Sequence, residues 1–297
     1  MGTNLFWRLQ MIKIMADSTC DLSDEILKQY DISIARLSIS INDKTYKDRL
    51  DISPDEFYEM LPTLSQFPTT AMPSPEEFIN IFHESIQAGY TEILCINMSS
   101  GTSGCYQSVT IAKDMFLEEN PDQNVKIHIV DSKSMSHGSG WLVLKSAQMR
   151  ENGASFEEIV EFNEKYKTKV KHFLSVDDLN HLIKSGRLYN ASAFIGKVLM
   201  LKPIMSMKQG KGAIVAKERG RKKVLKHYVN EFIARNDESK TDFIIIGYTN
   251  DLQVAEDLQA KLREETNFTG DIHIMQMGVS VGTHVGPGAI SMFFLEK

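Results

Sequence analysis

The sequence predicts an α/β fold made of two α/β domains with largely parallel sheets and a ligand site in the cleft between or within them. Short apolar runs typical of buried strands alternate with segments of helical periodicity through most of the chain. The length of 297 residues exceeds that of a usual single domain, which favours two domains. Segments rich in Ser, Thr and Gly follow several apolar runs, at the strand ends where open sheets bind ligands.

The first predicted domain covers residues 11–155. Met11 directly precedes an apolar run with the length of a strand, so residues 1–10 are interpreted as an upstream extension. The expected elements are, in order, a strand at 12–17, a helix at 23–30, two short strands around a turn at Asn42 and Asp43, a helix from Ser74 to Gly89, a strand at 92–98, a helix after the loop 99–104, a strand at 125–132 and a helix that ends near Glu151.

Two helix starts are marked by side-chain chemistry. Ser74 is a candidate N-cap, Pro75 suits the first helical position, and Glu77 completes a capping box. Ser155 and Glu158 repeat the same spacing after a break at the preceding glycine. We therefore predict the change of domain next to this second capping box.

The second predicted domain covers residues 156–297 and again alternates strands with helices. Its expected elements are a strand at 171–176, a short helix ending at Ser185 and Gly186, a long amphipathic helix at 191–201, a hairpin that turns at 209–212, a strand at 243–248, a helix at 251–265, and strands at 271–277 and 289–295.

Composition excludes several classes of function. The net charge of −6 argues against a nucleic-acid-binding protein, which is usually basic. The apolar run at 243–248 is far too short to cross a bilayer, so no stable membrane insertion is expected. No CxxC or HExxH spacing occurs, so the sequence predicts no metal site. With no secretory signal, Cys20, Cys95 and Cys105 are expected to be reduced thiols in the cytoplasm.

Four polar segments lie at the ends of predicted strands, at 17–21, 99–104, 131–140 and 282–289. Because ligands of open parallel sheets bind outside the carboxyl ends of the strands, these segments are expected to converge on one site. Two kinds of chemistry fit them: nucleophilic catalysis by a serine, or ligand binding by hydroxyl and backbone donors.

The catalytic interpretation would use Ser100 or Ser103 with His284 and Asp17. An α/β-hydrolase, however, requires G-x-S-x-G on a strand-to-helix turn, and this loop is one residue short of that pattern. The "KQGKGA" segment likewise lacks the spacing of a phosphate-binding loop and is expected to form a surface turn.

The binding interpretation fits the residue types better. Hydroxyls at Thr70 and Ser100, backbone N–H groups beside Gly101 and the imidazole of His284 are all suitable donors to a carboxylate. A buried carboxylate must be hydrogen-bonded or paired, because its desolvation alone is prohibitive. Ser and Thr beside Gly also serve as caps and turns, so both roles stay open for Ser100 at this point.

Six segments, taken together and in order from Met11 to Lys297, resemble the DegV family, whose members bind fatty acids. They are "DSTCDL" (17–22), "FPTTAMPSPEEF" (67–78), "SSGTSGCYQS" (99–108), "LIKSGRL" (182–188), "KERGRKK" (217–223) and "THVGPGA" (283–289).

This resemblance implies a protein that binds a long-chain fatty acid in an apolar tunnel and is not itself an enzyme. A separate fatty-acid kinase would act on the exposed carboxyl group to form acyl phosphate, and no cofactor besides the bound acid is expected. Transferred by motif, the carboxylate contacts fall on Thr70, Ser100 with Gly101, and His284. Arg187 and Arg219 match basic positions near the cleft or its partner-facing rim.

The sequence departs from the family pattern at two places. Where the family commonly has Thr-Ser-Gln-Pro-Ser, this chain has Ala71 and Met72 in place of the two inner polar residues, and Ser185 replaces a glycine before Arg187. The alternatives to fatty-acid binding are a serine hydrolase or acyltransferase that uses Ser100 or Ser103, and a sensor of small anions. Candidate tunnel-lining residues are Phe194, Ile195, Val198, Leu199 and the run 200–204.

Overall fold

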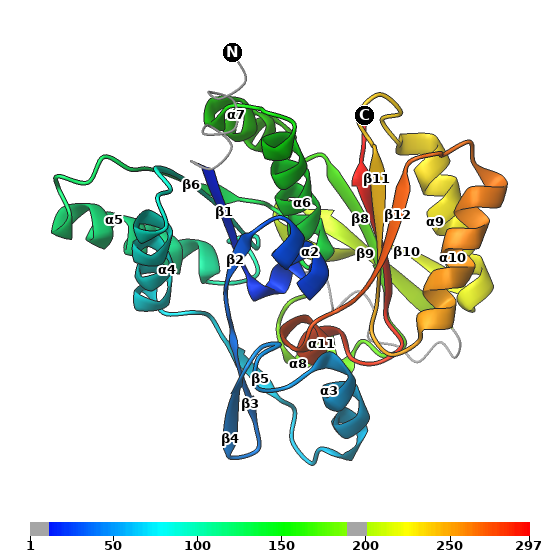
Figure 1. Ribbon diagram of the computed structural model, residues 1–297. Coiled ribbons are helices and arrows are strands. Elements are labelled where there is room, and N and C mark those ends of the chain that lie inside the picture. Colours follow the sequence, from blue (N-terminus) through cyan, green and yellow to red (C-terminus); the bar gives the residue numbers. More distant parts are fainter. Residues whose placement is uncertain (1–11, 189–200) are drawn as a thin grey trace.

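The computed structural model describes residues 12–188 and 201–297, and its first sheet is fully parallel (Figure 1). The central strand of this sheet is buried at every position, as expected where helices cover both faces. In spatial order the described strands are β2 (Ile32–Ala35), β1 (Ile12–Asp17), β6 (Glu92–Asn97) and β7 (Lys126–Asp131).

The second sheet is mixed, and this differs from the expectation of largely parallel sheets. Only β11 and β12 pair in parallel among its described strands, because β13 inserts antiparallel between β8 and β11 and because β9 and β10 form a hairpin. In spatial order the strands are β10 (Lys211–Arg219), β9 (Leu201–Lys208), β8 (Val170–Ser175), β13 (Ile290–Leu295), β11 (Phe243–Tyr248) and β12 (Asp271–Gln276).

A small antiparallel sheet at the bottom of Figure 1 joins three short strands, β4 (Lys44–Lys47), β3 (Ser38–Ile41) and β5 (Thr69–Ala71). The predicted turn at Asn42 is present, and Asn42 has a φ of 51°, which asparagine tolerates better than most residues. The pairing of Ile39 with Thr70 fixes the position of Thr70 at the edge of this sheet.

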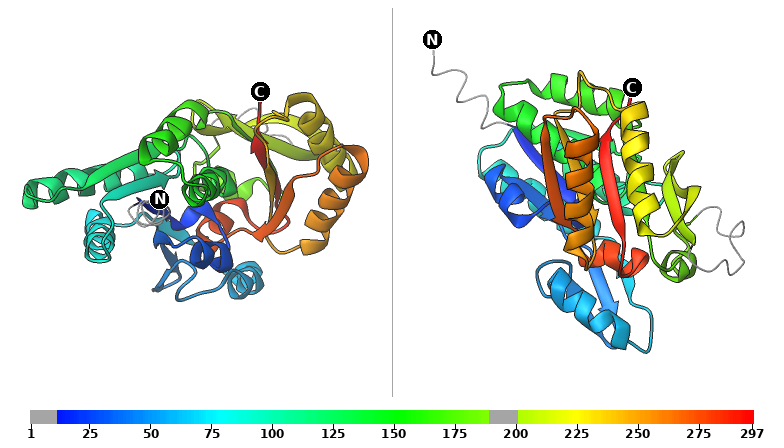
Figure 2. Two further views of the ribbon diagram at one scale, coloured as in Figure 1. Left: turned by 45° about the horizontal axis from the view of Figure 1, so that its top comes forward. Right: turned by 90° about the vertical axis from the view of Figure 1, so that its right-hand side faces the viewer.

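Helices separate and cover the two large sheets in layers (Figures 1 and 2). On the outer face of the first sheet lie α4 (Pro75–Gln87) and α5 (Cys105–Glu119), and on the outer face of the second lie α9 (Arg221–Arg235) and α10 (Leu252–Glu265). Between the sheets lies α6 (His137–Glu151), with α7 (Phe156–Tyr166) beside it. The shorter helices are η1 (Ser18–Cys20), α2 (Asp24–Gln29), α3 (Pro54–Met60), η2 (Leu61–Thr63), α8 (Asn180–Lys184) and α11 (Val279–Val285).

Helix α6 forms the shared core of the two halves of the chain. The ring of Trp141 stacks on Phe243 with 5.0 Å between centroids, and its Nε1 donates to the Phe243 carbonyl oxygen at 3.2 Å. Ile14 and Ile96 of the first sheet belong to the same apolar cluster as Phe243 and Phe293 of the second. The two sheets therefore bury one continuous apolar layer against opposite sides of this helix.

Both predicted capping boxes are present. The Ser74 hydroxyl accepts from the backbone N–H of Glu77, and Ser155 does the same for Glu158. The division of domains at residue 155 stays a prediction; α7 packs on α6 and on strands of the first sheet. The predicted helix at 191–201 lies outside the described residues except for its last position, which begins β9.

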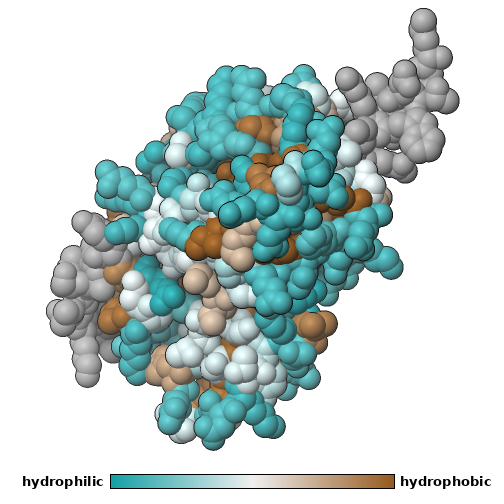
Figure 3. Space-filling model, turned by 90° about the vertical axis from the view of Figure 1, so that its left-hand side faces the viewer, coloured by the Kyte–Doolittle hydropathy of each residue, from teal (hydrophilic) through white to brown (hydrophobic). Residues whose placement is uncertain are grey.

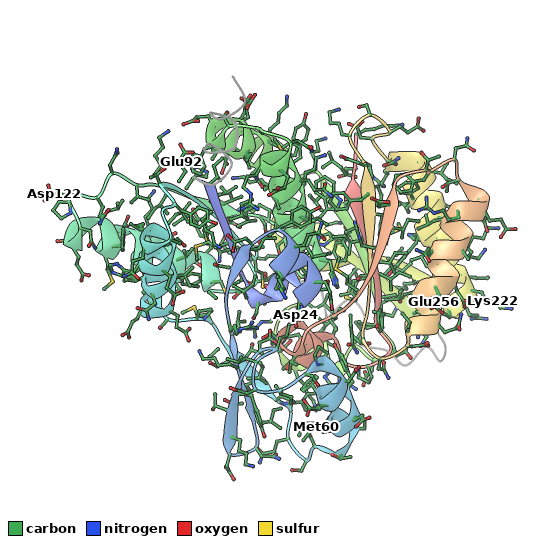
Figure 4. The ribbon with its side chains drawn as sticks, in the orientation of Figure 1. Asp24, Met60, Glu92, Asp122, Lys222 and Glu256 are labelled. Carbon is green, nitrogen blue, oxygen red and sulfur yellow. The ribbon has the colours of Figure 1, made fainter. Side chains whose placement is uncertain are left out.

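The outer surface is mainly hydrophilic on the side formed by α4 and α5, with hydrophobic patches near its middle (Figure 3). Ile111 and Met115 of α5 are among the exposed large apolar side chains. At the opposite side, Lys222 and Glu256 lie on α9 and α10 (Figure 4). Within the described ranges, every helix is too short or too polar to cross a bilayer.

Gly140 provides a test of the packing between α6 and η1. A Cβ atom at this position would lie 2.2 Å from the Cys20 carbonyl oxygen, a backbone atom that cannot move aside alone. We expect Gly140→Ala to lower the free energy of unfolding by about 1–3 kcal/mol, the usual cost of overpacking. Gly104→Ala is the matched control, because its Cβ would meet only the flexible Met72 side chain, which is 51% exposed. Equal effects in urea denaturation would contradict this assignment.

Candidate functional site

A narrow, mainly apolar cavity lies between α11, the second sheet and the ends of the strands of the first sheet. It encloses about 700 Å³ of empty space, counting its opening to solvent. Its apolar walls include Leu174, Val281 and Phe293, and its polar residues include Thr70 and His284. The other described lining residues are Thr19, Leu37, Met98, Thr102, Ser103, Met135, Ser136, His172, Leu182, Arg187, Met277, Ser280, Val285 and Ser291.

Thr70 and His284, which are 214 positions apart in the sequence, meet at this cavity. The Thr70 hydroxyl lies 2.9 Å from His284 Nε2, while Nδ1 of the same ring is buried and has no hydrogen-bond partner among the described residues. If the hydroxyl donates to Nε2, the proton of the neutral ring lies on Nδ1, which then has a free donor. The ring thus lines the cavity and has one nitrogen to which the described residues supply no hydrogen-bond partner.

His284 is electrically neutral near neutral pH in this environment. Its pKa is lowered to about 4, mainly by burial and in addition by the nearby Arg187 and His181. Arg187 itself lines the cavity, so a fixed positive charge and a neutral imidazole lie near one another. A bound carboxylate would be attracted by the first and would raise the pKa of the second.

Helix α11 holds His284 in place, and its start is capped by two buried carboxylates from the first half of the chain. Asp21 Oδ1 accepts from the Gly278 N–H at 2.8 Å, and Asp48 Oδ1 accepts from the Val279 N–H at 3.2 Å. Asp48 also accepts from the Ser18 hydroxyl at 2.8 Å. These contacts satisfy N–H groups that a helix start otherwise leaves unpaired.

The structure corrects the interpretation of segment 282–289 as a polar strand end. Residues up to Val285 form the last turns of α11, and only the following residues form a turn. Gly282 serves packing in this helix, because a Cβ there would lie 2.4 Å from the Tyr58 hydroxyl oxygen. Tyr58 in turn donates to the Met277 carbonyl oxygen at 3.0 Å.

Ser100 is engaged away from the cavity. Its hydroxyl donates to the Asp131 carboxylate, and its backbone N–H donates to Asp131 Oδ1 at 3.1 Å. Lys133 pairs with the same carboxylate. Gly101 contacts the hairpin turn, where an added Cβ would lie 2.5 Å from the Gly210 carbonyl oxygen. Of the serines in the loop 99–104, Ser103 is the one among the described cavity-lining residues.

The residues of the catalytic interpretation do not form a hydrogen-bonded triad among the described residues, although Ser103 and His284 line the same cavity. Asp17 accepts from the N–H groups of Thr19 and Met98 at 3.1 and 2.9 Å, and it thereby links the ends of β1 and β6. The Ser100 hydroxyl donates to Asp131, whereas His284 is hydrogen-bonded to the Thr70 hydroxyl. No hydrogen bond joins His284 to a serine among the contacts of the described residues.

Arg219 lies on the surface at the end of β10 and is exposed.

The segment "KQGKGA" forms the predicted hairpin turn, with Gln209 and Gly210 at φ of 51° and 75°. Among the tunnel-lining candidates, Ile204 belongs to the apolar cluster on the opposite face of the second sheet, and Leu201 begins β9. The candidates Phe194, Ile195, Val198, Leu199 and Met200 lie outside the described residues.

Sequence reasoning did not single out Asp21, Asp48 or the cavity-lining Ser280, although Asp21 lies in the polar segment 17–21. Asp21 has a left-handed backbone conformation with φ of 56°, and the carboxylates act through contacts with residues more than 200 positions away. The only sequence signal for α11 is the apolar pair Val279 and Val281, which also fits a strand. The described residues contain no cluster of three or more potential metal ligands.

Comparison with known proteins identifies the family. The model of the DegV family, described as uncharacterised proteins, matches residues 11–297. The chain belongs to the DegV family. A DegV domain-containing protein of Clostridium acetobutylicum is 36% identical over 291 residues, which cover 97% of this chain and 100% of that protein. The resemblance inferred from the sequence segments is thus confirmed.

Solved structures of DegV-family proteins share the fold. A stearic acid-binding protein from Eubacterium ventriosum matches with a TM-score of 0.87 and 28% identity, covering 97% of this chain and 99% of that one. A fatty acid binding DegV-family protein from Streptococcus agalactiae matches with a TM-score of 0.83 and 29% identity, covering 96% and 99%. The predicted α/β class is confirmed by these matches.

The buried carboxylate of Asp21 predicts a pH effect on stability. Burial raises its pKa from 3.8 to about 7, opposed by the Ser136 hydrogen bond and reinforced by the charge of Asp48. Between these two values the folded protein holds a proton that the unfolded chain releases, so this group's contribution to stability falls as pH rises. The free energy of unfolding of Asp21→Asn, relative to that of wild type, should therefore rise from pH about 4 to about 7 and should not change further above pH about 7.

Urea denaturation at several pH values measures the difference in free energy of unfolding between wild type and Asp21→Asn. Because the other titrating groups are common to both proteins, their contributions cancel in this difference. Asp24→Asn is the control, because the Asp24 carboxylate is 72% exposed. A difference between wild type and Asp21→Asn that does not depend on pH would contradict the raised pKa.

Proposed function

We propose that the protein binds a long-chain fatty acid in the cavity and presents its carboxylate to a separate fatty-acid kinase, which forms acyl phosphate. The observation that carries the proposal is the pairing of Thr70 with His284 at one end of a mainly apolar cavity. DegV-family proteins of similar structure have been solved as fatty acid and stearic acid binders. The protein would act in the cytoplasm and would not itself be an enzyme.

The proposed carboxylate contacts are Thr70, Ser103, Arg187 and His284. All four line the cavity, and three of them offer a hydroxyl or imidazole donor beside the fixed charge of Arg187. Ser100 and Gly101 then support the loop through Asp131 and Gly210 rather than touching the acid. Ser103 replaces Ser100 in the proposal because Ser103, unlike Ser100, is among the described cavity-lining residues.

Affinity in this arrangement would come from the acyl chain, and orientation from the polar residues. Burial of a methylene group contributes about 0.8 kcal/mol, so a chain of about sixteen carbons gains roughly 12 kcal/mol before the costs of binding. Each hydrogen bond adds only about 1 kcal/mol net, and about twice that when it involves a charge. Loss of one polar contact is therefore expected to change presentation of the carboxylate more than retention of the lipid.

The kinase contact is proposed for the surface that carries Arg219. Its guanidinium is exposed at the end of β10, and among the described residues it makes no ion pair. The neighbouring Arg221 is different, since it pairs with Asp177 at 2.9 Å and donates to the Gly288 carbonyl oxygen at 3.0 Å. Exposure of Arg219 supports its role as a partner contact in this proposal, whereas Arg221 stabilises the turn that follows α11.

Binding is favoured over hydrolysis by the contacts of the serines. A serine nucleophile needs a base within hydrogen-bonding distance, and His284 bonds instead to Thr70. An esterase assay with a chromogenic acyl ester should therefore give no turnover with the purified protein. Detection of an acyl-serine adduct at Ser100 or Ser103 would overturn the proposal.

The two serines of the loop form a matched pair for testing the carboxylate site. Ser103→Ala removes a proposed contact and should slow phosphorylation of the bound acid by a purified fatty-acid kinase about tenfold, the effect of roughly 1.4 kcal/mol. Ser100→Ala should change this rate less, because its hydroxyl bonds to Asp131. The opposite ranking, at equal lipid content by mass spectrometry, would restore Ser100 as the contact.

His284→Ala separates lipid retention from presentation. We expect the variant to co-purify with fatty acid, because the apolar chain supplies most of the affinity, and to lose most acyl-phosphate formation. Lipid content and kinase turnover are measured on the same preparation. Full turnover without the imidazole would remove His284 from the mechanism, and absence of lipid in wild type from a host rich in fatty acids would contradict the proposed ligand.

Arg219→Glu tests the partner surface. Charge reversal should slow acyl-phosphate formation at low salt and leave the lipid content unchanged, because the side chain is exposed and is not among the described cavity-lining residues. Arg263→Glu is the control, because Arg263 is also exposed but lies on α10, which packs near the opposite edge of the second sheet from β10. An equal effect of both reversals would point to the net charge of the protein rather than to a specific contact.

A further inference from the structure

Three hollows of the structure adjoin one another, and His172 lines all of them. The first is the cavity described above. The second, of about 300 Å³, shares Met135, Leu174, Leu182 and Arg187 with it. The third is an open groove of about 770 Å³ that shares Ser206 with the second. Among the described residues, only His172 borders the cavity and also the groove.

The strand register places His172 at the far end of the cavity from His284. Leu174 pairs with Ser291, and His172 pairs with Phe293, so all four side chains lie on one face of the sheet. The chain enters β13 at Ile290 directly after the turn that follows α11. Progress from Ser291 to Phe293 therefore leads away from α11, and the cavity extends along β8 and β13 toward His172.

The groove continues in the same direction because β8 and β9 separate. Only Leu174 and Ser175 of β8 pair with β9, whereas β8 pairs with β13 along its whole length. Beyond the last pair, Val170 and Lys171 border the groove on one side and Ser206 on the other. The cavity and the groove are thus successive parts of one passage between the strands.

The imidazole of His172 is held firmly within this passage. A Cβ on Gly138 of α6 would lie 3.2 Å from its Nδ1, and the Phe293 ring lies 5.5 Å from it between centroids. His172 is 5% exposed, and its Nε2 has no hydrogen-bond partner within the part of the chain that the structure describes. Burial, and then the charge of Lys171, lower its pKa to about 3, so the ring is neutral.

We propose that His172 closes the end of the acyl cavity and thereby sets the longest fatty acid that the protein accepts. This inference rests on the proposed fatty-acid function. An acyl chain with its carboxylate at Thr70 and His284 would extend along Leu174 and end against the His172 ring. Beyond the ring, Lys133, Lys167 and Lys171 line the groove, and this polar, open surface gives a methyl end little burial.

The test is a chain-length series of saturated fatty acids bound to delipidated protein and measured by calorimetry. For wild type, affinity should rise with each added methylene and fall sharply at a limiting length. His172→Ala should move this limit to longer chains, with a gain of up to about fourfold for each further methylene that becomes buried. An unchanged limit in a folded His172→Ala protein would overturn the proposal.

Two controls make the outcome specific. His273→Ala also removes a histidine whose Nε2 is buried without a partner, but His273 lies on β12 and is absent from the described cavity lining. The limiting chain length of the His273→Ala variant should equal that of wild type. Wild type that binds no acid of the series would contradict the proposed function itself, whereas binding with an unchanged limit in His172→Ala would contradict only the role of His172.

A second measurement needs no substitution. A fatty acid of the limiting length with a photoreactive group at its methyl end should label wild-type protein in the segment around His172 or Ser206. Peptide mapping by mass spectrometry gives the position. Labelling confined to α11 would place the methyl end at the opposite end of the cavity and would overturn the proposal even if His172→Ala failed to fold.

Discussion

The capping of α11 by Asp21 and Asp48 is the interaction on which the site depends. These carboxylates come from the first half of the chain and accept hydrogen bonds from Gly278 and Val279 in the last quarter. They fix the helix that carries His284, and so they also fix the distance between His284 and Thr70. Removal of one carboxylate would leave helix N–H groups buried without partners, which costs more than the loss of a surface contact.

This anchor requires a backbone that is strained in several places. Asp21, Arg49 and Ser136 all have positive φ, and none is a glycine. The Ser136 hydroxyl donates to Asp21 at 2.5 Å, and Arg49 donates to the Leu22 carbonyl oxygen at 2.6 Å. Such conformations cost free energy and persist only where the surroundings determine them fully. Their concentration beside α11 indicates that the position of this helix, rather than local stability, is what the segment maintains.

Helix α6 gives the cavity its second constraint. Because the helix is buried against both sheets, their strand ends are held at a constant separation, and the cavity forms where the shared apolar layer ends. The cavity has donors near α11 and an aromatic and aliphatic surface along β8 and β13. A ligand that matches it has one anionic end and one apolar chain, which is the chemical form of a fatty acid.

The sequence by itself determined the α/β class, most element positions and both capping boxes, because these depend on contacts within a few residues. It also pointed to Thr70 and His284, whose motifs carry the family resemblance. The structure brings these two side chains within 2.9 Å of each other, and their contact with a ligand stays a proposal. Local pattern could not separate Ser100 from Ser103, since both lie in one polar loop; what distinguishes them is the contact of Ser100 with Asp131 and the place of Ser103 in the cavity lining.

Only the tertiary structure decided the antiparallel insertion of β13, the capping of α11 and the position of His172 at the end of the cavity. Each depends on pairing between segments that are distant in the sequence, such as His172 with Phe293. A strand's apolar pattern is the same whichever neighbour it pairs with, and the sequence alone does not show whether a histidine is buried or exposed. The physical reason is that register and burial are properties of the assembled sheet, not of its separate strands.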